Sequence, residues 1–224
     1  MPAKHLDTRP AAIPNAKNGK VVPFRPRKAS RRLTSAPPRR KTNAAVRTRE
    51  YLTPDEVAKL LKAAQEGRYG QRDAAAILVA YRHGFRVTEL VSLRWEQIDL
   101  KAGLLHVNRL KNGTPSTHPL RGTELRAIRQ LRRDWPDSPY VFCSERGGPM
   151  TTSNVRKLIA RCGVEAGLDF PVHPHMLRHA CGFKLANDGQ DTRAIQLYMG
   201  HKNIQHTTRY TELSPERFKR FWQD

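Results

Sequence analysis

The amino-acid sequence predicts a mainly α (α+β) protein, a helical bundle with a small three-stranded antiparallel sheet. Three observations support this class. Apolar residues recur at helical spacing in several segments after residue 50, an Asn-Gly pair separates two strand-like runs within 104–120, and only helical patterns follow residue 151. No apolar run reaches the roughly 18 residues that a membrane-spanning helix needs, so we expect no membrane association.

Residues 1–49 differ in composition from the rest of the chain. They contain 14 Lys and Arg residues, a single acid and seven of the 16 prolines. Such a segment cannot bury enough apolar surface to offset the entropy lost on ordering it. We therefore predict a disordered, basic, proline-rich arm at 1–49 and one folded domain at 50–224. The arm either lies along DNA phosphates or is only a solvated tail.

The first predicted helix lies within 51–65, where the start signals are complete. Thr53 is a suitable N-cap, Pro54 fits the first helical position, and Glu56 completes a capping box. Apolar residues then recur three and four positions apart, which indicates one face packed against a core.

The remaining elements follow in chain order. Asn112-Gly113 favours a tight hairpin turn within 104–120, and the run "YVFC" at 140–143 is interpreted as one more strand. Further helices are expected at about 73–83, 88–97, 123–135, 153–166, 174–187, 191–199, 203–209 and 214–222.

Charge and cysteine use narrow the class of protein. The net charge of +21 and the pI near 10.7 favour a partner such as nucleic acid, although a histone-like packing protein is an alternative. Cys143, Cys162 and Cys181 are odd in number and form no CxxC pair, which argues against a disulfide framework. Because no apolar signal-peptide core begins the chain, we expect a cytoplasmic protein.

The stretch "HPHMLRH" at 173–179 concentrates candidate functional side chains. His175 and His179 are four residues apart on one helix face, a spacing that zinc ligands use. Arg178 lies beside them, however, and a fixed cation opposes a bound divalent ion. His175 and Arg178 instead suit an anion, because a guanidinium matches phosphate oxygens in two places. A helix surface without any ligand is the third interpretation.

Other segments favour the phosphate interpretation. One arginine stands in "RVTE", one lysine at the predicted hairpin tip, one histidine after a glycine in "YMGH", and one tyrosine nine residues later. In this order they resemble the catalytic domain of the tyrosine recombinase (phage integrase) family over about residues 50–220. "RLKNGTPSTHPL" and "YMGHKNIQHTTRYT" are similar, in particular, to the short recombinases that invert a fimbrial promoter switch. The matching positions are Arg86, Lys111, His175, Arg178, His201 and Tyr210.

The resemblance implies a role for each matching residue. Two arginines would clamp the non-bridging oxygens of a phosphodiester and two histidines would add hydrogen bonds, which stabilises the charge of the transition state. Tyr210 would attack the phosphorus, the nearby cations would favour its phenolate, and His175 could accept its proton. Lys111 would protonate the leaving 5′-oxygen.

The resemblance also implies partners and an outcome. The enzyme would act on double-stranded DNA with specific recombination sites, as a homotetramer on two sites, with or without accessory DNA-bending proteins, through a 3′-phosphotyrosyl intermediate. Inversion, integration and excision remain alternatives. Neither ATP, a metal nor another cofactor is implied. The helical domain that precedes the catalytic domain in most members would be missing. A DNA-binding transcriptional regulator that does not cut and a type IB topoisomerase are the competing functions.

Several residues keep two interpretations. Glu89 either orients a cation or caps local backbone. Tyr198, the competing tyrosine, lies among apolar neighbours that favour a ring facing the core. The segment "ERFKRFW" at 216–222 either docks on a neighbouring protomer or completes its own core.

Deleting residues 1–49 is expected to weaken non-specific DNA binding and to flatten its salt dependence. Each phosphate that the arm neutralises would contribute about −0.9 to the slope of log K against log salt. Titration of a non-specific duplex over a range of salt concentrations measures both effects. An unchanged slope would assign residues 1–49 to a solvated tail.

Overall fold

The computed structural model of the chain describes residues 49–110 and 113–212. Most of the predicted arm, the predicted hairpin residues 111–112 and the predicted helix at 214–222 lie outside the described residues. The described residues all belong to one unit, Ala44–Asp224.

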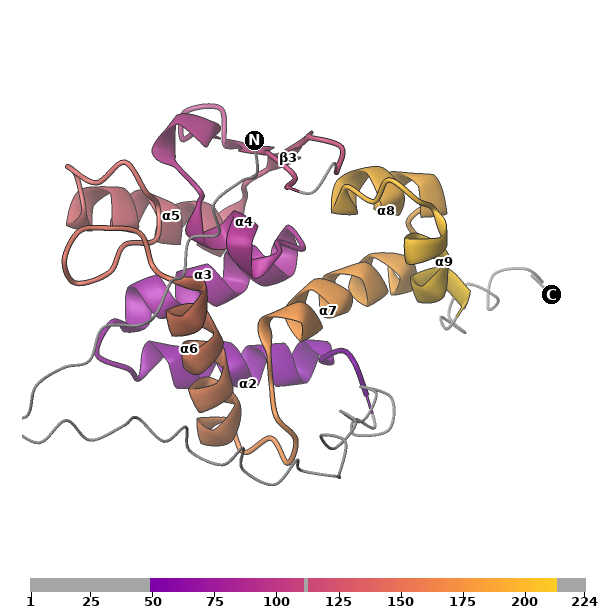
Figure 1. Cartoon of the computed structure of the whole chain (residues 1–224), viewed down its shortest axis with the longest axis horizontal. Coiled ribbons are helices and arrows are strands. Elements are labelled where there is room, and N and C mark those ends of the chain that lie inside the picture. The colour runs from indigo at the N-terminus through magenta and orange to yellow at the C-terminus, as the bar shows by residue number, and fades with distance from the viewer. Residues whose placement is uncertain (1–48, 111–112, 213–224) are drawn as a thin grey trace, which may run out of the picture. The chain divides into compact units, whose positions relative to one another are not determined.

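The described residues form a mainly helical domain with a three-stranded antiparallel sheet, as predicted (Figure 1). The elements are, in order, α2 (Pro54–Gln65), α3 (Gly70–Arg82), α4 (Val87–Val91), the 3₁₀ helix η1 (Trp95–Gln97), β1 (Ile98–Asp99), β2 (Leu104–Val107), β3 (Ser116–Pro119), α5 (Gly122–Asp134), α6 (Thr152–Glu165), α7 (Pro174–Asn187), α8 (Thr192–Met199) and α9 (Gln205–Glu212).

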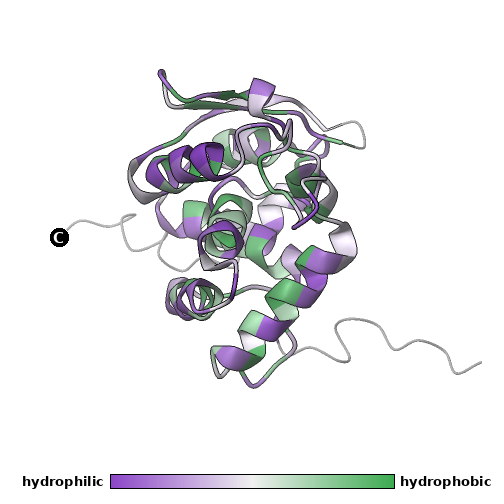
Figure 2. Ribbon diagram, turned by 90° about the vertical axis from the view of Figure 1, so that its left-hand side faces the viewer, coloured by the Kyte–Doolittle hydropathy of each residue, from purple (hydrophilic) through white to green (hydrophobic). Residues whose placement is uncertain are grey.

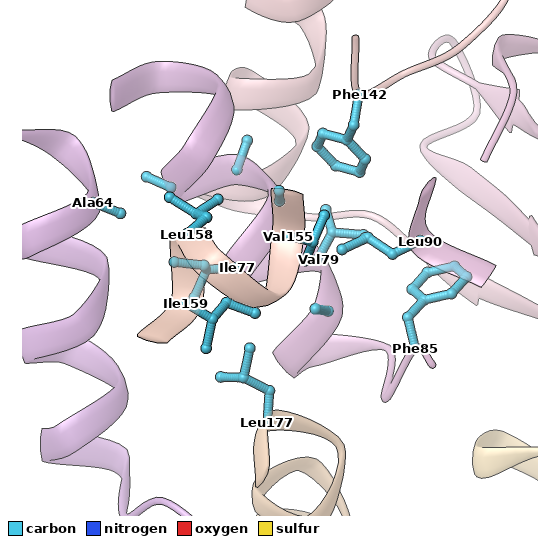
Figure 3. Close-up of a cluster of buried hydrophobic side chains, with 14 of the residues drawn as sticks. Ala64, Ile77, Val79, Phe85, Leu90, Phe142, Val155, Leu158, Ile159 and Leu177 are labelled. Carbon is cyan, nitrogen blue, oxygen red and sulfur yellow. The ribbon is translucent and has the colours of Figure 1, made fainter. Parts of the chain in front are cut away.

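The main core lies where α3 packs against α2, α5 and α7, and where α6 packs against α2 and α4. Val79, Ile159 and Leu177 come from three of these helices and are completely buried (Figure 3). Hydrophobic and hydrophilic residues alternate along the helices (Figure 2), as expected of helices with one buried face. Burial of these apolar faces is the main source of the domain's stability.

The predicted start of the first helix is confirmed. The Thr53 hydroxyl accepts a hydrogen bond from the Glu56 amide at 3.3 Å, and the Glu56 carboxylate accepts one from the Thr53 amide at 2.8 Å. This capping box satisfies two amides that the first helical turn leaves without partners.

The sheet has the order β1-β2-β3, with both pairs antiparallel. Leu105 pairs with Ile98 on one side and with His118 on the other. Leu105 and Val107 are buried whereas His106 between them is exposed. One face of β2 therefore packs on the helices, as the two-residue period of a strand requires.

The third strand is Ile98–Asp99 and not 140–143, so that prediction is wrong. Val141, Phe142 and Cys143 are consecutive buried residues, and the segment forms only isolated bridges, one of them between Arg94 and Tyr140. The Val141 amide donates a hydrogen bond to the Leu93 carbonyl, and the Phe142 carbonyl accepts one from the Met150 amide. A run buried on both sides resembles a strand in sequence even when no neighbouring strand pairs along it.

The predicted helix at 88–97 is also interrupted. α4 ends at Val91, where Leu93 turns into the core and its carbonyl accepts a hydrogen bond from the distant Val141 amide at 3.0 Å. Arg94 is extended before η1 begins. The hydrophobic spacing in this segment therefore reflects two short helices that contact the same core.

The four helices predicted between residues 153 and 209 are confirmed to within three residues at each end. α7, α8 and α9 pack on one another around a second cluster that includes Phe183, Ile195, Met199 and Tyr210. Among the residues that the structure describes, none of the helices combines the length and apolar character required to cross a membrane.

We expect Ile159→Ala to lower the free energy of unfolding by about 2–5 kcal/mol, because the buried side chain leaves a cavity that the core fills only partly. Val164→Ala on the same helix is the matched control. Its side chain is 77% exposed, so we expect a change of about 0.5 kcal/mol or less. Urea unfolding measures both, and equal losses would contradict this account of the core.

Candidate active site

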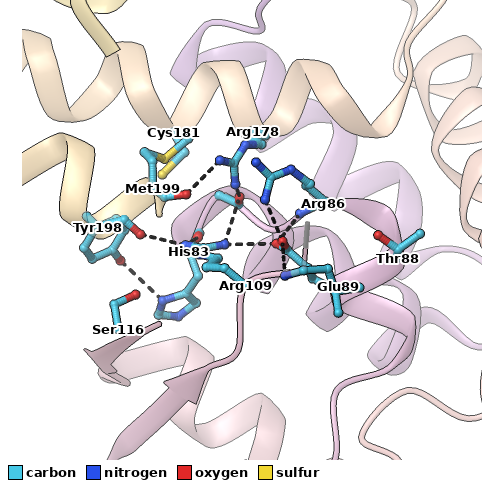
Figure 4. A network of polar contacts seen from close by, with 12 residues as sticks. His83, Arg86, Thr88, Glu89, Arg109, Ser116, Arg178, Cys181, Tyr198 and Met199 are labelled. Carbon is cyan, nitrogen blue, oxygen red and sulfur yellow. Dashed lines mark hydrogen bonds and ion pairs between the residues drawn. The ribbon is translucent and has the colours of Figure 1, made fainter. Parts of the chain in front are cut away.

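The carboxylate of Glu89 organises one side of the candidate site. It lies on α4, is 2% exposed and accepts four hydrogen bonds (Figure 4). Two come from Arg86, from its amide at 3.0 Å and its Nη1 at 2.7 Å. The others come from Arg109 Nη1 at 3.1 Å and the Leu110 amide at 3.2 Å. Both interpretations of Glu89 therefore hold, since it caps the helix backbone and also orients cations.

The hydrogen bonds and charges around Glu89 keep it ionised. Burial by itself would raise the pKa of this carboxyl group. The hydrogen bonds from Arg86 and the positive charge of Arg109 outweigh burial and lower the pKa. Glu89 therefore supplies a fixed negative charge between two arginines.

Arg109 is the residue that the sequence interpretation missed. Its side chain is completely buried next to Glu89. Nη2 donates to the carbonyls of His83 at 2.9 Å and Tyr198 at 2.6 Å, and Nη1 donates to the Gly84 carbonyl at 3.4 Å. The guanidinium thus joins the segment after β2 to the loop after α3 and to the end of α8.

Arg178 is also buried, with 1% of its surface exposed. It lies on α7, which begins at Pro174 as predicted. Its guanidinium donates to the carbonyl of Gly84, and to that of Met199 at 2.7 Å. Burial and the charge of Arg86 lower the pKa of Arg178 to about 10. The loop at Gly84 thus accepts hydrogen bonds from both buried arginines (Figure 4).

His201 follows the left-handed turn that ends α8. Gly200 has φ +64°, and a Cβ there would lie 2.5 Å from Arg109 Cγ, so this position requires glycine. His201 Nδ1 lies 2.8 Å from the Thr207 hydroxyl. Arg86, Gly113 and His201 line a hollow of about 510 Å³ with residues of the 193–206 segment.

Tyr210 lies on α9 with 1% of its surface exposed, packed against α7. Its hydroxyl is 3.0 Å from His179 Nδ1. A Cβ at Gly182 would lie 2.6 Å from the tyrosine ring, so this glycine lets the ring approach the helix. Burial raises the pKa of Tyr210 to about 12, and Arg178 opposes the rise. The nearby cations act as expected, but burial outweighs them.

The structure thus places the predicted residues in two neighbouring groups. Arg86 and His201 open onto the hollow, and Arg178 is tied to the segments that precede them. His175 is exposed on the first turn of α7, and Tyr210 is bonded to the same helix. Lys111 lies outside the described residues.

His179 is a second residue that the predicted set omitted. Its ring meets that of His175 edge to face, with centroids 4.4 Å apart, and it contacts the hydroxyl of Tyr210. Burial and the nearby charge of His175 lower the pKa of His179 to about 3, so it is neutral near pH 7. The four-residue spacing placed it on the same helix face as His175, which is the signal that could have identified it. Within residues 49–110 and 113–212, no group of three or more His, Cys, Asp or Glu side chains is arranged to hold a metal ion.

Tyr198, the competing tyrosine, has a structural environment. Its ring stacks on that of His118 with centroids 3.8 Å apart, and its hydroxyl donates to the Arg82 carbonyl at 2.9 Å. Burial raises its pKa. Its side chain is partly buried in contact with the sheet, in agreement with the predicted packing role.

Comparisons with known proteins concern the domain as a whole. The profile of the phage integrase family matches residues 50–217. The chain is 44% identical, over 181 residues, to the type 1 fimbriae regulatory protein FimE of Escherichia coli strain K12, an alignment that covers 78% of this chain and 91% of FimE.

Two solved structures share the fold. The crystal structure of XerA recombinase matches with a TM-score of 0.67 and 28% identity over 75% of this chain and 62% of XerA. A lambda integrase dimer bound to a COC′ core site matches with a TM-score of 0.61 and 22% identity over 78% of this chain and 50% of that chain. This chain therefore spans less than two thirds of either solved protein.

We expect the stability of the domain to fall as the pH drops from about 6.5 toward 3. Burial lowers the pKa of His118, His179 and His201 to about 3, so the unfolded chain binds protons that the folded chain does not. Below the unfolded pKa of about 6.5, each histidine lowers the free energy of unfolding by at most about 1.4 kcal/mol per pH unit. Above that pH, its contribution to stability is fully present.

Urea unfolding between pH 7.5 and 5 tests this expectation. His118→Asn should reduce the dependence of stability on pH, because it removes one of the three groups. His106→Asn, an exposed histidine on the neighbouring strand, is the control that should leave the dependence unchanged. Equal pH dependence in all three proteins would contradict the assignment.

Proposed function

This chain belongs to the phage integrase family and is a site-specific tyrosine recombinase, an enzyme that exchanges DNA strands, and we propose that Tyr210 is its nucleophile. The observation that carries the proposal is the position of Tyr210. It packs against α7, the helix of His175 and Arg178, and its hydroxyl contacts His179 on that same helix.

In the reaction, the phosphodiester of the DNA strand is exchanged for a phosphodiester to the tyrosine. The Tyr210 oxygen forms a bond to phosphorus as the bond from phosphorus to the 5′-oxygen breaks, which leaves a 3′-phosphotyrosyl link. The tyrosine proton passes to a histidine of α7. His179 is neutral and already in contact, and His175 lies beside it. Lys111 donates a proton to the departing 5′-oxygen.

Arg86, Arg178, His175 and His201 stabilise the negative charge that spreads over the non-bridging oxygens. Cations and hydrogen-bond donors held in place before the reaction act most strongly in a site that excludes water. Removing one such donor typically raises the barrier by about 3–4 kcal/mol. The arrangement supports this role, because Arg86 and His201 line one hollow and Arg178 is bonded to two carbonyls, of Gly84 and Met199, in the segments that precede them.

The substrate is double-stranded DNA that carries specific recombination sites. The net charge of +21 and a hollow lined by Arg86, Arg193 and Lys202 suit a phosphate backbone. The similarity to FimE favours inversion of a promoter segment over integration or excision. We further propose that the enzyme acts as a homotetramer on two sites, together with accessory DNA-bending proteins. It would need no cofactor and would work beside the bacterial nucleoid.

We expect Tyr210→Phe to bind DNA normally and to form no covalent adduct, because it lacks only the attacking oxygen. Tyr198→Phe is the matched control and should retain adduct formation. The probe is a duplex selected by the full chain from a random-sequence pool and nicked near its centre. Denaturing electrophoresis then separates the adduct from free DNA.

The competing functions predict other results. An adduct that survives in Tyr210→Phe contradicts the assignment of the nucleophile. Binding without any adduct in the unsubstituted chain favours a regulator that does not cut. Relaxation of plasmid without sequence preference or pairing of sites indicates a topoisomerase.

A further inference from the structure

We propose that Thr207 is a positioning residue for strand cleavage, which holds the ring of His201 in the tautomer that carries its proton on Nε2. The proposal rests on the role proposed above for His201 as a hydrogen-bond donor to a non-bridging oxygen. It is carried by one buried hydrogen bond between the loop that follows α8 and the first turn of α9.

The hydroxyl of Thr207 lies 2.8 Å from His201 Nδ1. Thr207 is completely buried, and His201 is 8% exposed. Within residues 49–110 and 113–212, this ring nitrogen is the hydroxyl's sole hydrogen-bond partner. The hydrogen bond is therefore shielded from water, and neither group has an alternative partner in the described structure.

The burial of the hydroxyl determines the direction of this hydrogen bond. A hydroxyl carries one proton, and a buried donor without an acceptor is unfavourable. If Nδ1 held the ring proton and donated to Thr207, the hydroxyl proton would need a second acceptor, which the described residues do not supply. Thr207 therefore donates and Nδ1 accepts, so the proton of a neutral His201 ring lies on Nε2.

The position of this proton matters because His201 is neutral near pH 7. Burial and the charge of Arg178 lower the pKa of His201 to about 3. A neutral ring has a single N–H donor. Since Nδ1 is bonded to Thr207, Nε2 is the donor left for the hollow that His201 lines with Arg86. The opposite tautomer would present a lone pair to a phosphate oxygen, and two acceptors repel each other.

The helix that carries the proposed nucleophile also carries Thr207. Thr207 and Tyr210 are three residues apart on α9 and lie on one face of it. The rings of His201 and Tyr210 are nearly parallel, with centroids 6.1 Å apart. On the side of α8, which packs on α9 (Figure 1), Gln196 Nε2 donates to the His201 carbonyl at 3.0 Å. The backbone of His201 is thus held by α8 and its ring by α9.

The first measurement is the tautomer itself. Long-range correlation of ring protons and nitrogens, in the full chain labelled with ¹⁵N-histidine at pH 7.5, distinguishes a protonated from an unprotonated ring nitrogen. The signals that are missing from His201→Ala identify this residue. We expect one tautomer in the unsubstituted chain, with the proton on Nε2.

The variants test whether Thr207 selects this tautomer. Thr207→Val removes the hydroxyl but keeps the shape of the side chain, and we expect it to show a mixture of tautomers. Thr207→Ser restores the hydroxyl and should restore the single tautomer. Thr208→Val on the same helix is the matched control, because the Thr208 hydroxyl donates to the Gln205 carbonyl at 3.2 Å and not to a histidine. It should leave the signals of His201 unchanged.

The second measurement is the rate of adduct formation on the selected nicked duplex described above. Thr207→Val should slow it roughly ten- to hundredfold, as is typical when the partner that orients a metal-binding histidine is removed. Thr207→Ser should retain most of the rate, and Thr208→Val all of it. In the His201→Ala background Thr207→Val should cause no further loss, because the hydroxyl acts through His201. Thermal unfolding checks that each variant is folded, and Thr207→Ala serves where Thr207→Val is not.

Three results overturn the proposal. The first is a proton on Nδ1 in the unsubstituted chain, and the second is a single, unchanged tautomer in Thr207→Val. The third is an equal slowing by Thr207→Val with and without His201, which would leave Thr207 a role in stability alone. If His201→Ala forms the adduct at the full rate, then His201 is not a donor and the positioning role falls with it. The assignment of Tyr210 is tested separately, by the adduct that Tyr210→Phe fails to form.

Discussion

The buried ion pair between Glu89 and Arg109 is the interaction on which the site depends. Its two side chains are completely buried and come from α4 and from the segment after β2. Through it, the N-terminus of α4, the start of the hairpin loop and the end of α8 are held together by direct hydrogen bonds. Segments that lie far apart in the chain thereby acquire fixed relative positions.

Such a pair is not explained by stability alone. Removing two charges from water is unfavourable, and an apolar pair of similar volume often stabilises a protein equally well or better. Apolar side chains would, however, leave the Leu110 amide and the carbonyls of His83 and Tyr198 without these partners. Unsatisfied buried groups are costly, so the pair is better understood as the means of joining irregular backbone around a reactive site.

The sequence predicted most helices and the hairpin because their signals are local. A capping box, a helical period and a short strand-like run each lie within a few residues, whereas the predicted Asn-Gly turn falls partly outside the described residues. The third strand, Ile98–Asp99, has only two residues and therefore shows no periodic pattern in the sequence. The break after Val91 was not predictable either, because the hydrogen-bond partners of Leu93 and Trp95 come from the distant segment 139–141. Five of the six predicted site residues lie in neighbouring segments of the described structure, but their environment could not be predicted from spacing. One sequence feature could have indicated that Arg109 is buried. It continues the two-residue period of Leu105 and Val107, which places it on the same inward face of the strand.

The balance of charge in the site relates this architecture to phosphodiester chemistry. Arg86, Arg109 and Arg178 converge around a single carboxylate, that of Glu89, and backbone carbonyls satisfy much of the remaining donor capacity. Three guanidinium groups thus surround one carboxylate, and burial, together with the charges of Arg86 and Arg109, lowers the pKa of Arg178. A phosphodiester carries the opposite charge, and a pentavalent transition state carries more of it. In the proposed function, the protein would fix this excess of positive charge in advance, and the electrostatic energy would be released mainly when negative charge develops at phosphorus, which is the condition for stabilising a transition state more than a ground state.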